Sequence, residues 1–143
     1  MAAEIFETNS PDETFNLGKK LGQEAIPGTI IAMTGDLGVG KTLFTQGFAK
    51  GLGIDEPITS PTFTIMQIYE SGRIPFYHFD VYRIADPEEM DEIGFENFVC
   101  GDGASIIEWA ELIEEIIPPE AIKITIEKDL EKGFDYRKIT VVK

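Results

Sequence analysis

The chain has 143 residues, 43% of them hydrophobic, which suits a single globular domain covering residues 1–143. Its 26 acidic residues outnumber its 12 basic residues, and the resulting net charge of −14 disfavours tight, direct binding of nucleic acid by this chain alone. No apolar run approaches the roughly 20 residues that span a bilayer, and the first residues lack the pattern of a signal peptide, so we expect a cytoplasmic protein.

The first predicted helix begins at a capping signature. Residues 10–13 combine serine, proline and glutamate in the order of a capping box, which predicts a helix from there to about residue 25. Gly18 and Gly22 share one face of this helix. Because each costs roughly 1 kcal/mol against alanine, they indicate close approach to another element. Thr14 either contacts a bound base or is a surface threonine.

A phosphate-binding motif follows. Residues 29–34 form an apolar, β-branched run that predicts a buried strand, and residues 35–42 match G-x-x-x-x-G-K-[ST]. In this motif glycines let successive amide N–H groups face an anion, Lys41 brings a positive charge to the phosphates, and Thr42 offers a hydroxyl to Mg²⁺. A helix predicted over residues 43–52 directs the positive end of its dipole at the same place. The expected nucleotide contacts are Asp36, Leu37, Gly38, Val39, Gly40, Lys41, Thr42 and Leu43.

A loop rich in hydroxyl groups and proline comes next and includes Ser60 and Thr62. It leads into a predicted hairpin with strands over residues 63–69 and 74–82. Such a loop resembles a switch that the γ-phosphate and Mg²⁺ order, and a plain connecting loop is the alternative.

Two acidic residues end apolar strands. Asp80 lies near the end of the second hairpin strand, and Glu108 lies at the end of a strand predicted over residues 104–109. Acids at such positions hold magnesium or order water in phosphate-loop enzymes, so both are candidates for a hydrolysis site. Trp109 either covers this site and stacks on a base or is a half-buried core residue. His78, the sole histidine, lies between aromatic residues and is expected to be packed rather than catalytic.

The remaining segments predict two helices and a closing hairpin. A second capping signature at residues 86–89 starts a helix that Gly94 interrupts, and another helix is expected over residues 110–117. Strands over residues 122–126 and 136–142 form the hairpin. The single cysteine, Cys100, excludes an internal disulfide and is expected to be a small core residue.

Four blocks of this sequence, in this order, resemble the bacterial TsaE family, also described as YjeE-like: residues 35–42, residues 60–64, residues 77–83 with 86–89, and residues 107–109. The resemblance covers nearly the whole chain and implies a three-layer α/β P-loop domain, with a mainly parallel central sheet and added antiparallel strands. It also implies a weak ATPase that uses ATP and Mg²⁺ and works with the TsaB and TsaD proteins. That assembly attaches a threonylcarbamoyl group to adenosine 37 of tRNAs reading ANN codons, and the partners would hold the tRNA.

The resemblance also implies residue roles. Lys41 would contact phosphate, Thr42 and Glu108 would serve magnesium, Asp80 would be the acid needed for hydrolysis, Ser60 and Thr62 would lie in the switch-like loop, and Trp109 would lie near the nucleotide. The chain departs from the family at Leu43, where a second hydroxyl residue is common, and at Ala110, where proline is common. Neither departure touches the metal or hydrolysis positions.

Two other functions are compatible with a phosphate loop. A small-molecule kinase is disfavoured because the chain has little room for an acceptor domain, and only two arginines precede Arg137. A regulator that binds nucleotide without turnover is the second alternative. The sequence has no N-K-x-D motif, which favours adenine over guanine, and nothing in it demands self-association, so a monomer is expected.

Overall fold

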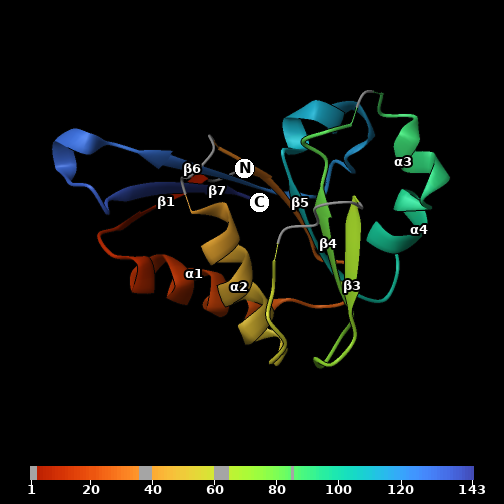
Figure 1. The fold of residues 1–143 in the computed structure, drawn as a ribbon, viewed down its shortest axis with the longest axis horizontal. Helices are drawn as coiled ribbons and strands as arrows, with labels where there is room; N and C mark the ends of the chain where they lie inside the picture. Colours follow the sequence, from red (N-terminus) through yellow and green to blue (C-terminus); the bar gives the residue numbers. More distant parts are fainter. Residues whose placement is uncertain (1–2, 36–39, 60–64, 85) are drawn as a thin grey trace.

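The computed structural model describes residues 3–35, 40–59, 65–84 and 86–143. In these ranges a seven-stranded sheet has the order β1-β7-β6-β2-β5-β4-β3 (Figure 1). The strands are β1 (Ala3–Thr8), β2 (Ile30–Thr34), β3 (Met66–Tyr69), β4 (Phe76–Asp80), β5 (Ala104–Glu108), β6 (Ile122–Lys128) and β7 (Arg137–Val142). The helices are α1 (Pro11–Glu24), α2 (Lys41–Gly51), α3 (Glu89–Glu92) and α4 (Phe95–Val99), with 3₁₀ helices η1 (Ala110–Ile116) and η2 (Leu130–Lys132).

The centre of the sheet is parallel. β2 pairs in parallel with β5 and β6, and β5 also pairs in parallel with β4. The antiparallel strands β3, β7 and β1 extend this centre on its two sides. Parallel strands end at the same edge of a sheet, so the ends of β2, β4 and β5 are neighbours.

Helices cover both faces of the sheet (Figure 1). On one face, Phe44 and Phe48 of α2 share a buried cluster with Ile31 of β2. On the other face, Met90 of α3 and Phe95 of α4 share a second cluster with the alternate strand residues, whose side chains point to that face. The two clusters give the three-layer α/β architecture that the family resemblance implies.

The backbones of α1 and α2 touch through glycine. A Cβ atom placed on Gly18 would lie 2.3 Å from a backbone oxygen of α2, and one placed on Gly22 would lie 2.1 Å from another. The contact is reciprocal. A Cβ atom placed on Gly47 or Gly51 of α2 would lie 2.1 or 2.2 Å, respectively, from a backbone oxygen of α1. The close approach predicted from Gly18 and Gly22 is therefore confirmed.

Replacing Gly47 with alanine is expected to lower the free energy of unfolding by about 2–3 kcal/mol. The new methyl group would overlap the Phe15 carbonyl, and separating the helices outweighs the roughly 1 kcal/mol that alanine gains in helix propensity. Urea denaturation measures the difference. The control is Asn16→Ala on the exposed side of α1, which should change stability by less than about 0.5 kcal/mol. Equal stability of the two variants would contradict the close helix contact.

Most elements lie where the sequence placed them. The helix predicted from the first capping signature, at residues 10–13, is α1, where the Ser10 hydroxyl accepts a hydrogen bond of 3.2 Å from the Glu13 amide. The two predicted hairpins are β3–β4 and β6–β7. Within the described ranges, no helix combines the length and the apolar character needed to cross a membrane.

Three local expectations were incomplete or wrong. The strand β1 was not predicted, since it is an edge strand whose Ile5 is 60% exposed. Among the described strands it pairs with the distant β7 alone. The segment expected to be a regular helix after Trp109 is the 3₁₀ helix η1, which Ile113 interrupts with φ −129°. Cys100 is exposed and not a core residue, because it caps the end of the short helix α4.

Candidate functional site

The two strand-end acids lie together. Asp80 ends β4 and Glu108 ends β5, and the two residues are register partners in the parallel pair. Glu108 is only 3% exposed, whereas Asp80 is half-buried. The apolar strands thus carry two carboxylates to one place at the end of the sheet, next to β2, the strand that leads to the predicted phosphate loop.

The environment of Asp80 disfavours its charge. Burial raises the pKa of the Asp80 carboxyl above its ordinary value, and the neighbouring Glu108 charge raises this pKa further. The Tyr82 amide, which donates a hydrogen bond of 3.0 Å to Oδ1, lowers the pKa, as do His78 and Lys41. A carboxylate with a raised pKa is better suited to accept a proton near neutral pH than an ordinary one.

This shift predicts an effect of pH on stability. Because the folded-state pKa of Asp80 is raised, the native state binds this proton more tightly than the unfolded chain, and the resulting stabilisation is lost as pH rises through the folded pKa. At about pH 7, Asp80→Asn should therefore raise the melting temperature by roughly 1–3 °C. The gain should vanish at about pH 3, below the ordinary pKa. Thermal unfolding at both pH values tests this, with the exposed Asp135→Asn as the control that shows no gain.

Lys41 is the first residue of α2 and is buried. Its Nζ atom donates a hydrogen bond of 2.6 Å to the Gly35 carbonyl and lies 3.5 Å from the centroid of the Trp109 ring. The residue before it, Gly40, has φ 104°, a conformation that favours glycine, and has no side chain to cap the first amide groups of the helix. An ammonium group at the start of a helix, where the positive end of the helix dipole lies, fits an anion such as a phosphate.

Some predicted nucleotide contacts lie outside the described residues: Asp36, Leu37, Gly38, Val39, Ser60 and Thr62. They remain predictions, and so does the switch role of the loop that contains the last two. Thr42 is exposed at the start of α2, and the adjacent Leu43 is partly buried.

Trp109 links the lysine to the strand ends. Its ring is partly buried between Lys41 and Tyr82, and the Tyr82 and Trp109 ring centroids are 4.7 Å apart. Among the described residues it is the one non-glycine residue with positive φ, at 62°. Left-handed backbone at a bulky residue is costly and tends to mark functional sites. The half-buried placement is confirmed, and stacking on a base remains a prediction.

Thr14 is not a surface residue. Its side chain is buried in α1, and its hydroxyl lies 2.8 Å from the hydroxyl of Thr8 at the end of β1. The surface interpretation is therefore wrong, because β1 covers this position. Contact between Thr14 and a base remains a prediction.

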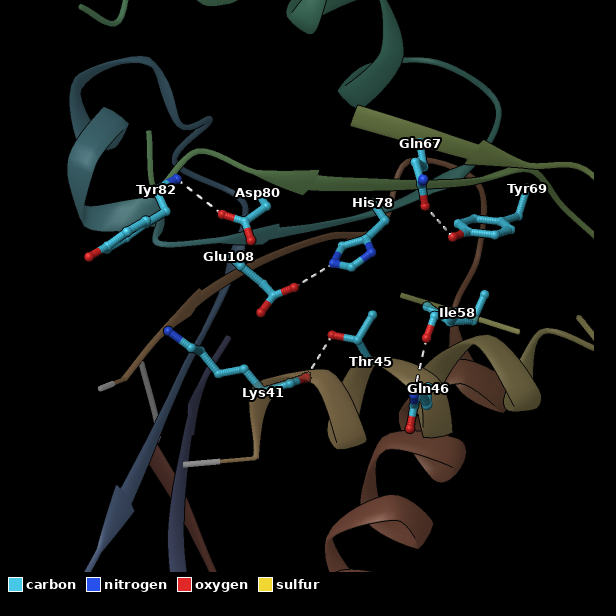
Figure 2. A network of polar contacts seen from close by, with 10 residues as sticks. All are labelled: Lys41, Thr45, Gln46, Ile58, Gln67, Tyr69, His78, Asp80, Tyr82 and Glu108. Carbon is cyan, nitrogen blue, oxygen red and sulfur yellow. Dashed lines mark hydrogen bonds and ion pairs between the residues drawn. The ribbon is translucent and has the colours of Figure 1, made fainter. Parts of the chain in front are cut away.

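His78 belongs to this site, although its sequence context indicated only packing (Figure 2). It is packed, with no exposed surface and its ring nearly parallel to that of Phe76. However, its Nε2 atom lies 2.5 Å from Oε2 of Glu108. One signal pointed this way: His78 precedes Asp80 by two residues, so strand alternation places both side chains on the same face of β4.

The described residues include no cluster of three or more His, Cys, Asp and Glu side chains able to hold a metal ion. A nucleotide-bound Mg²⁺ does not need one, since it takes one or two protein oxygens and completes its shell with phosphate and water. The buried carboxylate of Glu108 and the hydroxyl of Thr42 are hard oxygen donors of the kind that Mg²⁺ prefers.

Comparisons with known proteins agree with this architecture. The sequence profile of the family described as "Threonylcarbamoyl adenosine biosynthesis protein TsaE" matches residues 8–139. The "tRNA threonylcarbamoyladenosine biosynthesis protein TsaE" of Bacillus subtilis (strain 168) is 44% identical over 135 residues, which cover 94% of this chain and 82% of that protein. The protein of the same name from Treponema pallidum (strain Nichols) is 40% identical over 119 residues, or 83% of this chain and 87% of the relative.

The fold comparison gives the same result. The crystal structure of Bacillus subtilis YdiB matches with a TM-score of 0.80 and 40% identity, covering 98% of this chain and 84% of YdiB. The fold is therefore of the P-loop NTPase type that the sequence predicts. With a profile match and sequence relatives that span most of its length, the chain belongs to the TsaE family of tRNA threonylcarbamoyladenosine biosynthesis proteins.

Proposed function

We propose that this protein is a Mg²⁺-dependent ATPase, weak on its own, that acts in the cytoplasm with TsaB and TsaD in the threonylcarbamoyl modification of adenosine 37 in tRNAs reading ANN codons. The observation that carries this proposal is the meeting of Lys41, at the start of α2, with the paired acids Asp80 and Glu108 at the ends of β4 and β5. A lysine at a helix start and strand-end acids are the parts that phosphate-loop ATPases use.

In the proposed reaction, the oxygen of a water molecule bonds to the γ-phosphorus of ATP while the bond from that phosphorus to the β–γ bridging oxygen breaks, giving ADP and inorganic phosphate. Asp80 orients the water and accepts its proton, a role that its raised pKa favours. Lys41 offsets the charge that develops on the departing β-phosphate oxygens. Thr42 and Glu108 are the residues that would hold Mg²⁺, which would supply positive charge to offset the charge that develops during phosphoryl transfer.

The charge of the chain supports an indirect contact with tRNA. A net charge of −14 repels a phosphate backbone, so the partners would hold the tRNA and this subunit would contribute its ATP cycle. The family membership supports the pathway, since both relatives above carry the name of tRNA threonylcarbamoyladenosine biosynthesis proteins.

The test is phosphate release from ATP by the purified chain alone, with TsaB and TsaD together, and with each partner singly. We expect slow release alone and faster release with both partners, and we expect tRNA modification in vitro to need all three proteins. Labelled γ-phosphate that appears on a metabolite would instead identify a kinase. Bound ATP that stays intact in every mixture while modification proceeds would identify a non-catalytic regulator.

A further inference from the structure

The contact between His78 and Glu108 is a directional hydrogen bond, which the packing of buried side chains alone does not require. His78 and Glu108 come from adjacent parallel strands, β4 and β5, and both side chains face α2 (Figure 2). The imidazole Nε2 atom lies 2.5 Å from one carboxylate oxygen, Oε2. When Glu108 is ionised, its carboxylate only accepts hydrogen bonds, and the hydrogen between these atoms is then carried by Nε2.

Glu108 depends on this hydrogen bond. Its side chain is buried, and a buried carboxylate without donors is costly. In the part of the chain that the structure describes, His78 supplies the one hydrogen bond to the Glu108 carboxylate. The second oxygen is turned away from His78, on the side where Lys41 lies (Figure 2).

The histidine is itself held firmly. It has no exposed surface, and its ring is nearly parallel to that of Phe76, with an angle of 10° and centroids 6.0 Å apart. Among the described residues, no partner exists for its other nitrogen, Nδ1. A phenylalanine would satisfy the stacking and would leave no buried nitrogen unpaired. The polar ring is therefore explained by its contact with Glu108 and not by the core around it.

We propose that His78 is a positioning residue of the ATPase site: its Nε2–H group holds one oxygen of Glu108 and leaves the other free for the metal and its water. This inference rests on the proposed function, because it assigns His78 to the carboxylate that serves Mg²⁺ there. Groups that orient a ligating carboxylate typically change metal affinity or activity by about 10–100-fold when they are removed.

Three substitutions separate positioning from packing. His78→Phe keeps a flat ring against Phe76 but removes the donor. His78→Gln places an amide donor near the position of Nε2, whereas His78→Asn carries the same amide one methylene shorter and does not reach Glu108. We expect kcat to fall about 10–100-fold in the Phe and Asn variants, with the KM for ATP changed less than about 3-fold. The Gln variant should keep kcat within about 3-fold of the parent.

A second readout needs neither nucleotide nor metal. Because His78 is the only histidine, its side-chain N–H signal can be assigned in a nitrogen-edited NMR spectrum of the untagged chain. A hydrogen bond to a carboxylate moves that proton far downfield, and Glu108→Gln should move it back upfield. Thermal unfolding of each variant gives the fraction of folded protein, by which the measured rates are corrected. If the Phe variant does not fold, the comparison of the Gln and Asn variants is the test.

The outcomes distinguish this inference from the proposed function. If the parent chain hydrolyses no ATP with or without its partners, the proposed function fails, and the NMR result still decides whether His78 holds Glu108. If the parent is active and the Phe variant keeps its kcat, the positioning role is overturned. Equal losses in the Gln and Asn variants, or an N–H signal that Glu108→Gln leaves in place, would also overturn it.

Discussion

Replacing Lys41 with alanine is expected to lower the affinity for ATP by more than about 100-fold, which corresponds to roughly 2.7 kcal/mol. The ammonium group is buried at the start of α2 beside the Trp109 ring, where a charge-assisted hydrogen bond to phosphate is stronger than in open solvent. In the described structure Lys41 donates to the Gly35 carbonyl, at the first residue of the phosphate-binding motif. Titration calorimetry with ATP and Mg²⁺ measures the change.

Two further variants isolate the charge of Lys41. Lys41→Met keeps the apolar stem beneath Trp109, so a loss of affinity equal to that of the alanine variant would assign the effect to the ammonium group. Lys50→Ala removes a lysine from the other end of α2, where it pairs with Asp55 on the surface, and should leave ATP affinity unchanged. Unchanged affinity in Lys41→Ala would show that the nucleotide binds elsewhere.

Asp80→Asn is expected to reduce kcat by about 100-fold or more while the affinity for ATP changes by less than about 3-fold. Asparagine has the same size as aspartate and keeps an oxygen for the Tyr82 amide, which donates to Oδ1 at 3.0 Å. It cannot accept a proton from water at neutral pH. Single-turnover hydrolysis and nucleotide titration, run on the same preparation, separate the two quantities.

The same variant should be more stable and less active than the parent chain. A partly buried charge that weakens the folded state and serves the reaction has this combined signature. Asp135→Asn, which changes an exposed acid, should alter neither property. An Asp80→Asn protein that turns over ATP at the parent rate would remove Asp80 from the mechanism, and Glu108 would then be the acid to examine.

The sequence predicted the centre of the fold well, because buried parallel strands have a strong local signal. The apolar run before the phosphate motif is β2, and the apolar runs that end in Asp80 and Glu108 are β4 and β5. The two glycines of α1 also indicated a tight contact with another element, because glycine lowers the stability of a helix relative to alanine. These features depend on residues that are close together in the chain.

The features that the sequence did not predict depend on pairings over long distances. β1 is held by β7 at the other end of the chain, and its exposed side chains give no apolar pattern. The contact of His78 with Glu108 requires β4 and β5 to be neighbours in a set register, which one sequence does not specify. The burial of Thr14 was not predicted because the strand that buries it, β1, depends on the same pairing over a long distance.

The placement of Trp109 gives the protein an optical reporter of its own. The chain has one tryptophan, and its indole lies 3.5 Å from the ammonium group that is expected to meet the phosphates. Indole emission responds to a charge at such a distance, so any ligand that draws the lysine away changes the fluorescence of a single known residue. The proposed binding and release of nucleotide would then be followed in real time on the unlabelled chain, with and without the proposed partner proteins.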